Sequence, residues 1–94
     1  MRDRINKLEV EFVKEMPKTK QPGILYISKE YGVAIHLCAC GCGKQTVTPI
    51  GQIGTRNWKL VENGALVSLQ PSILNSGLEC KSHYFVRDNK IVWC

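Results

Sequence analysis

Apolar and polar residues alternate in short runs along the chain, and turn-forming residues separate these runs. The alternation is clearest over residues 8–13, where apolar side chains flank two glutamates. A period of two residues is that of a strand with one buried face, whereas a helix repeats about every 3.6 residues. No stretch keeps a helical period, so the pattern predicts a mostly β protein.

Three pairs of β-rich runs enclose turn signals and are predicted to form hairpins. An Asn-Gly pair, favoured in tight hairpin turns, lies in the second, and Asp88-Asn89 lies in the third. The hairpins span residues 24–38, 58–69 and 82–93. The pattern therefore favours a small antiparallel sheet or a barrel-like sandwich.

The remaining segments are a strand and two connections. Residues 45–50 read as a short strand ended by a proline, and residues 16–23 contain two prolines and a glycine, which predict a loop. Residues 70–77 are predicted to be a loop or a single helical turn. Val33, Ile35 and Leu37 are predicted to face the core. This leaves His36, Cys38 and Cys40 on the opposite face.

Length and composition indicate one domain. The 94 residues, 44% apolar and 22% charged, suffice for one thin hydrophobic core and are too few for two. We therefore treat residues 1–94 as a single zinc-binding β domain, with its recognisable motifs between residues 24 and 93. No apolar run approaches the roughly 20 residues of a membrane span, and the first residues carry no apolar signal-peptide core. The expected location is the cytoplasm.

The net charge of +5 is spread over the chain. No basic block is interleaved with aromatic residues, as a nucleic-acid-binding face would require. The charge permits weak attraction to polyanions and disfavours nucleic acid as the main partner. A basic nucleic-acid-binding module stays an alternative, which a steep loss of binding with salt would reveal.

The five cysteines are numerous for a chain of this length. A cytosolic setting favours metal ligation over disulfides. Cys38, Cys40 and Cys42 are too close in sequence to cross-link separate segments, but their sulfurs can converge on one ion. The second cluster is Cys80-x-x-His83, a spacing that recurs in zinc knuckles.

We predict that these two clusters hold one structural Zn²⁺. Cys80 and His83 would supply two ligands, and the cluster at 38–42 would supply the other two. Cys40 and Cys42 are favoured, with Cys38 as the alternative. A closed tetrahedral site would stabilise so thin a core by about 10 kcal/mol.

Two other interpretations of the cysteines stay open. Buried thiols often behave simply as small apolar side chains. A Rieske-like 2Fe-2S redox protein would pair two histidines with two thiolates, and His36 with Cys38 would then accompany Cys80 and His83. In the first pair, however, the histidine precedes the cysteine, whereas the Rieske pattern has the order Cys-x-His. Brown colour would distinguish the iron–sulfur protein from a colourless zinc protein.

The sequence gives no obvious catalytic set. A zinc closed by four cysteine or histidine ligands has no open position for water. Ser72 follows a proline, yet with His83 assigned to zinc no histidine and carboxylate are placed to activate it. We therefore expect a protein that is not an enzyme and that acts as a protein-interaction or accessory module, with another protein as its partner.

The residues resemble a family of small bacterial proteins of unknown function. Its pattern is H-x-C-x-C-G-C-G, V-T-P, W-x-L, V-S-L-x-P-S-I, C-x-S-H-Y-[FW] and V-x-W. The corresponding segments here are residues 36–43, 47–49, 58–60, 67–73, 80–85 and 91–93, the last with Ile91 in place of the valine. Some members are encoded beside bacterial ubiquitin-like modifiers and their activating and conjugating enzymes. The resemblance implies zinc binding and an accessory role with ubiquitin-like conjugation components. Ser76, where the family has an aromatic residue, and the final Cys94 depart from the pattern without touching the proposed ligands.

Overall fold

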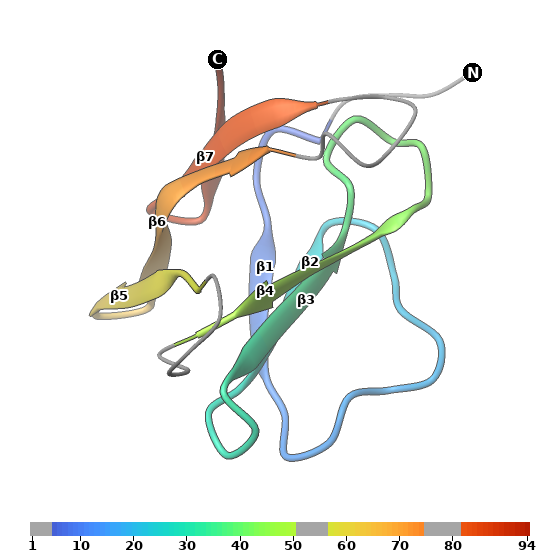
Figure 1. The fold of residues 1–94 in the computed structure, drawn as a ribbon, viewed down its shortest axis with the longest axis vertical. Coiled ribbons are helices and arrows are strands. Elements are labelled where there is room, and N and C mark those ends of the chain that lie inside the picture. Colours follow the sequence, from blue (N-terminus) through green and yellow to red (C-terminus); the bar gives the residue numbers. More distant parts are fainter. Residues whose placement is uncertain (1–4, 51–56, 75–81) are drawn as a thin grey trace.

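The strands of the chain form two four-stranded sheets (Figure 1). The computed structural model describes residues 5–50, 57–74 and 82–94. The first sheet consists of β1 (Glu9–Phe12), β2 (Ile24–Ser28), β3 (Val33–Leu37) and β4 (Gln45–Pro49), in that order. The second consists of β5 (Lys59–Asn63), β6 (Leu66–Leu74), β7 (His83–Arg87) and β8 (Lys90–Trp93), also in chain order.

The expected mostly β fold is confirmed, and the three predicted hairpins are present. Five of the strand pairs in the two sheets are antiparallel, whereas β1 pairs with β2 in parallel. Parallel neighbours need a long connection, and the predicted loop over residues 16–23 supplies it. The described residues include no helix that could cross a membrane.

The two sheets meet at their edge strands and enclose one core. One isolated β-bridge joins Lys7 to Lys90, the first residue of β8. Another joins Ile50, just after β4, to Trp58, just before β5. Each sheet therefore continues into the other as in a barrel-like sandwich. The fully buried aliphatic and aromatic side chains come from both sheets: Leu8, Leu25, Ile27, Val67, Leu69, Ile73, Tyr84 and Val86. These contacts make the two sheets one hydrophobic unit.

The face of β3 that points into the core differs from the expected one. Ala34 and His36 are completely buried, and Cys38 just beyond the strand is 1% exposed. Ala34 and Cys38 belong to the core cluster, whereas Ile35 does not. The apolar pattern misled because β3 is central in its sheet and is covered on both faces, where alternation carries little information.

β6 extends farther than its sequence suggested. It runs to Leu74, so residues 70–74 are strand and not the predicted loop or helical turn; residues 75–77 of that prediction lie outside the described residues. Leu69 pairs with Val86, but Ile73 pairs with Tyr84. Three residues of β6 therefore face a single residue of β7, and such a bulge is where a strand tolerates a proline.

The turn between β7 and β8 also holds β6 and the N-terminal segment. Asp88 and Asn89 have φ values of 50° and 64°, as a tight hairpin turn requires. The Asn89 side-chain oxygen accepts a hydrogen bond from the amide of the buried Val67 at 2.7 Å. The Asn89 carbonyl accepts one from the Leu8 amide at 2.6 Å. One turn residue thus connects three segments of the fold.

Substitution of Asn89 will show how much this turn stabilises the fold. Asn89→Gly keeps the left-handed backbone but leaves the Val67 amide without its acceptor, which will lower the free energy of unfolding by about 2 kcal/mol. Asn89→Ala also strains the backbone, and we expect a loss of about 3 kcal/mol. Urea denaturation measures both. Asp88→Gly is the control, with a change of at most about 0.5 kcal/mol. Equal losses for Gly and Ala would contradict the role of the left-handed backbone.

Candidate functional site

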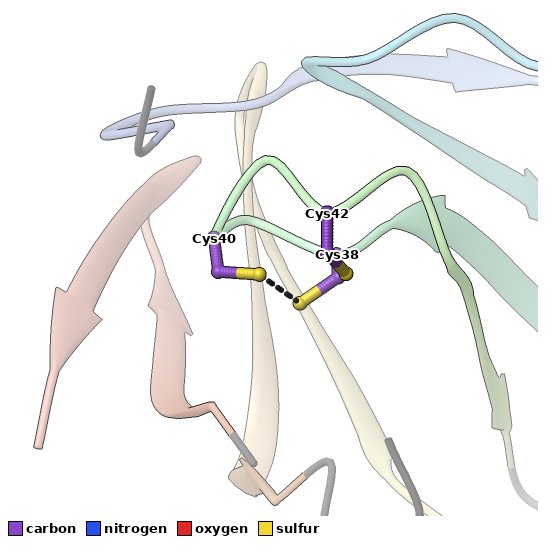
Figure 2. A group of neighbouring side chains, drawn as sticks. All are labelled: Cys38, Cys40 and Cys42. Carbon is purple, nitrogen blue, oxygen red and sulfur yellow. Dashed lines mark hydrogen bonds between the residues drawn. The ribbon is translucent and has the colours of Figure 1, made fainter. Parts of the chain in front are cut away.

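Cys38, Cys40 and Cys42 lie on one tight loop that follows β3, here called the cysteine loop (residues 38–43; Figure 2). The Cys38 amide donates to the Lys44 carbonyl at 2.7 Å and closes the base of the loop. Gly41 and Gly43 have φ values of 87° and 80°, which residues with a side chain rarely adopt. The glycines therefore allow the turns that bring the three sulfurs together.

The three sulfurs fit a thiolate metal site. All of them lie within 4.8 Å of one another, and the Sγ atoms of Cys38 and Cys40 are 3.4 Å apart. Zinc–sulfur bonds of about 2.3 Å in a tetrahedron place sulfurs about 3.8 Å apart. The cluster predicted from sequence is thus compact enough to share one ion, and all three cysteines belong to it where two ligands were expected.

The other two predicted ligands are Cys80 and His83. Cys80 lies outside the described residues, so its assignment stays a prediction. His83 is described, and it does not belong to the group of close potential ligands that the cysteines form. Its Nε2 lies instead 2.8 Å from Oγ of Ser72. Cys94, expected to take no part, is exposed.

Ser72 and His83 meet because of the register between β6 and β7. Leu74 pairs directly with His83, so Ser72 is the diagonal neighbour of His83 on the same face, close enough for side-chain contact. The intervening partners, Ile73 and Tyr84, are 1% and 0% exposed and point into the core. Ser72 and His83 therefore lie on the outer face of the second sheet, where both are only half-buried.

Backbone contacts fix both residues in place. The Trp58 indole Nε1 donates to the Ser72 carbonyl at 3.3 Å. The Cys94 amide donates to the His83 carbonyl at 3.1 Å. Within residues 5–50, 57–74 and 82–94 no carboxylate is hydrogen-bonded to His83. The described residues thus form a serine–histidine pair, an arrangement in which the imidazole can take a proton from the hydroxyl.

A hollow of about 400 Å³ lies on the two strands that carry this pair. Its lining comes from β6 and β7: Ser68, Leu69, Gln70, Phe85, Val86 and Arg87. Gln70 and Phe85 are each two residues from Ser72 and His83 in their strands. The Arg87 guanidinium carbon lies 5.0 Å from the Phe85 ring centroid. The hollow therefore combines an aromatic surface with one positive charge beside the pair.

His36, the histidine of the iron–sulfur alternative, is occupied by another contact. Its Nε2 lies 2.7 Å from the Tyr84 hydroxyl, and its Nδ1 has no hydrogen-bond partner among the described residues. Burial lowers the pKa of His36 from 6.5 to about 4, because the apolar surroundings disfavour the charged imidazolium. His36 is consequently a neutral, buried residue at neutral pH and is not accessible to a substrate.

Comparison with known proteins identifies a related family. A family model described as the bacterial ubiquitination-like system serine protease, BubE, matches residues 12–94. The match connects the chain with bacterial ubiquitin-like systems, in agreement with that part of the resemblance noted above. No curated protein and no solved structure matches the chain.

The expectation that the protein is not an enzyme is wrong, because the matching family is one of serine proteases. The sequence argument dismissed Ser72 because the only histidine near it in sequence had been assigned to zinc. It also placed Ser72 in a loop, which concealed that Ser72 and His83 lie on one sheet face. Because Ser72 stood in a predicted loop, no strand pairing was predicted from which the pair could have been found.

The cysteine loop should bind one metal ion per chain. Cys40→Ser and Cys42→Ser will each lower metal occupancy to below about half after dialysis against a weak chelator, because each removes one thiolate. Cys94→Ser is the control and will keep full occupancy. Elemental analysis of the purified proteins measures the metal and distinguishes zinc from iron. Equal occupancy in wild type and both loop variants would rule out the loop as the site.

Proposed function

Because the chain belongs to the BubE family of bacterial ubiquitination-like system serine proteases, we propose that Ser72 is its nucleophile and His83 its general base. The observation that carries this proposal is the 2.8 Å contact between Ser72 Oγ and His83 Nε2. This distance is within the range of a nucleophile and the base that activates it. The outer-face position of both residues leaves them accessible to a substrate protein.

The pair would begin catalysis by acyl transfer. With Nε2 unprotonated, the Ser72 hydroxyl donates its hydrogen bond to His83. When Oγ attacks the carbonyl carbon of the scissile amide, the hydroxyl proton moves to Nε2. The tetrahedral intermediate then collapses, the C–N bond breaks, and the imidazolium gives the proton to the leaving amine. An ester between the substrate acyl group and Ser72 remains.

Water completes the reaction. His83 takes a proton from a water molecule whose oxygen attacks the ester, and the proton returns to Ser72 Oγ as the C–O bond breaks. The sum is the addition of one water to one amide, which yields a carboxylate and an amine. No external oxidant, reductant or nucleotide is needed.

We propose that the substrate is a ubiquitin-like protein, cleaved at the bond after its C-terminal residue. The family description places the activity in a ubiquitination-like system, where such a bond joins the modifier to a target amine. The hollow beside Ser72 offers the aromatic surface of Phe85 for an extended tail. A tail that lies across the outer face of β6 and β7 would contact their side chains, because the backbone groups of both inner strands are paired within the sheet.

We further propose that the metal of the cysteine loop is zinc and that its role is structural. Cys38, Cys40 and Cys42 would hold it, with Cys80 as the fourth ligand, while His83 serves the serine. Zinc bound by thiolates supplies folding energy in small domains. No catalytic step requires it, because the Ser72–His83 pair supplies both nucleophile and base.

Substitution of either member of the pair tests this function. Ser72→Ala and His83→Gln will each lower cleavage of a C-terminally extended ubiquitin-like protein at least about 10³-fold, because each removes an essential partner of one proton transfer. Cleavage is followed by mass spectrometry of the product. Ser28→Ala, in β2 of the first sheet and outside the hollow, is the control and will stay within about threefold of wild type.

A zinc hydrolase would give the opposite pattern. Ser72→Ala would then retain activity, and substitution of a cysteine would abolish it in a protein that stays folded. Full activity of Ser72→Ala would refute the proposed nucleophile.

A further inference from the structure

The two residues that flank His83 both contact the cysteine loop or the strand that leads into it. Successive residues of a strand point to opposite faces, so Ser82 and Tyr84 turn inward when His83 turns outward. Ser82 and Tyr84 are 8% and 0% exposed, whereas His83 is half-buried on the outer face. His83 is thus held between two inward-pointing neighbours.

The Tyr84 hydroxyl connects β7 with the loop backbone. It accepts a hydrogen bond from the Ala39 amide at 3.3 Å and lies 2.7 Å from His36 Nε2. Ala39 lies between Cys38 and Cys40, whose sulfurs are 3.4 Å apart and are joined by the dashed line in Figure 2. A change in the loop backbone at this position would therefore displace the Tyr84 side chain.

The Ser82 hydroxyl makes the second connection. Its Oγ lies 3.0 Å from the Sγ of Cys38. A metal-bound thiolate would accept this hydrogen bond from the hydroxyl, and such contacts help to orient metal ligands. The same bond fixes the backbone on the N-terminal side of His83. Both neighbours of His83 consequently depend on the geometry of residues 36–40.

We propose that Ser82 and Tyr84 are positioning residues that transmit the geometry of the cysteine loop to His83. This inference rests on the proposed function of the Ser72–His83 pair. A metal that fixes the loop then aligns His83 with Ser72 although it contacts neither. Small displacements suffice for a large effect, because a misplacement of about 1 Å can lower a catalytic rate about a hundredfold.

Tyr84→Phe and Ser82→Ala test the proposal in the metal-loaded protein. Each removes one hydroxyl and keeps most of the side-chain packing. We expect each to lower the rate of Ser72 modification by a fluorophosphonate about tenfold or more. In that reaction the phosphorus bonds to Oγ, fluoride leaves, and His83 takes the hydroxyl proton. Metal content and melting temperature of every variant are measured beside the rate.

The chain offers a matched control for each variant. Tyr26→Phe removes another buried tyrosine hydroxyl, one that accepts from the Gln21 amide at 2.9 Å in the first sheet. Ser28→Ala removes another buried serine hydroxyl, which donates to the Lys14 carbonyl at 3.1 Å. Both controls destabilise the fold without touching β7, so both will react with the probe at the wild-type rate.

A second measurement does not depend on activity. In a Ser72→Ala background, NMR of the ¹⁵N-labelled histidine ring follows the environment of His83 directly. Chelation of the metal, Tyr84→Phe and Ser82→Ala should each shift or broaden the His83 ring signals, whereas Tyr26→Phe should leave them unchanged.

The outcomes separate the two proposals. Slower modification with altered His83 signals in the Ser82 and Tyr84 variants alone supports the positioning role. Wild-type rates and signals in both variants, or equal losses in the Tyr26 and Ser28 controls, would overturn it. If the wild-type protein is not modified at Ser72, the proposed protease function fails, and the NMR result still decides whether the loop positions His83.

Discussion

The pairing of β6 with β7 across a bulge is the constraint on which the candidate site depends. Before the bulge Leu69 pairs with Val86, and after it Ile73 pairs with Tyr84. Because side chains alternate strictly along a strand, a shift by one residue would turn Ser72 into the core and a core residue outward. The two extra residues of β6 preserve its inward apolar side chains on both sides of the bulge. The displacement of β6 along β7 at the bulge also brings Oγ of Ser72 within hydrogen-bond distance of Nε2 of His83.

β7 connects the core and the candidate site because one of its faces packs in the core and the other carries His83. On the inward face, Tyr84 and Val86 are almost completely buried. The Tyr84 ring also makes an edge contact with the Trp93 ring, with 5.1 Å between the ring centroids. Outward, the strand presents His83 and, two residues later, Phe85. Any force that holds the inward residues also limits the motion of the outward ones. The thin core, the cysteine loop and the serine–histidine pair therefore meet on one strand.

The sequence was sufficient to predict features whose signals are local. The hairpin turns at Gly64 and Asn89 follow from residues that adopt left-handed backbone conformations. The cysteine cluster follows from spacing alone, because alternate residues around two glycines can converge on an ion. Features that depend on contacts between distant segments could not be predicted in this way. Residues 70–74 were predicted to be a loop or helical turn because the bulge that lets β6 accommodate a proline is not visible in the sequence.

The prediction that His83 is a zinc ligand competes with the contact that the register of β6 and β7 gives this residue. A Cys-x-x-His spacing is a local signal for metal binding, whereas a serine–histidine pair requires knowledge of strand register. One imidazole nitrogen cannot coordinate a metal and accept the Ser72 proton at the same time, and the Nε2 contact of His83 is with Ser72. Cys80 and His83 have the spacing of a zinc knuckle. This spacing does not decide whether the His83 nitrogen binds a metal or Ser72.

A structural metal in the cysteine loop, as proposed above, would be compatible with a serine protease. Zinc bound by four thiolates would carry a net charge of about minus two (2 minus 4), which makes it a poor Lewis acid and a poor activator of water. The absence of a catalytic metal position was taken as evidence against catalysis, but it excludes only one route. A serine activated by histidine needs no Lewis acid, only precise alignment of two side chains. Three cysteines on a loop that contacts both neighbours of His83 would provide one means of alignment in a 94-residue chain with a thin core.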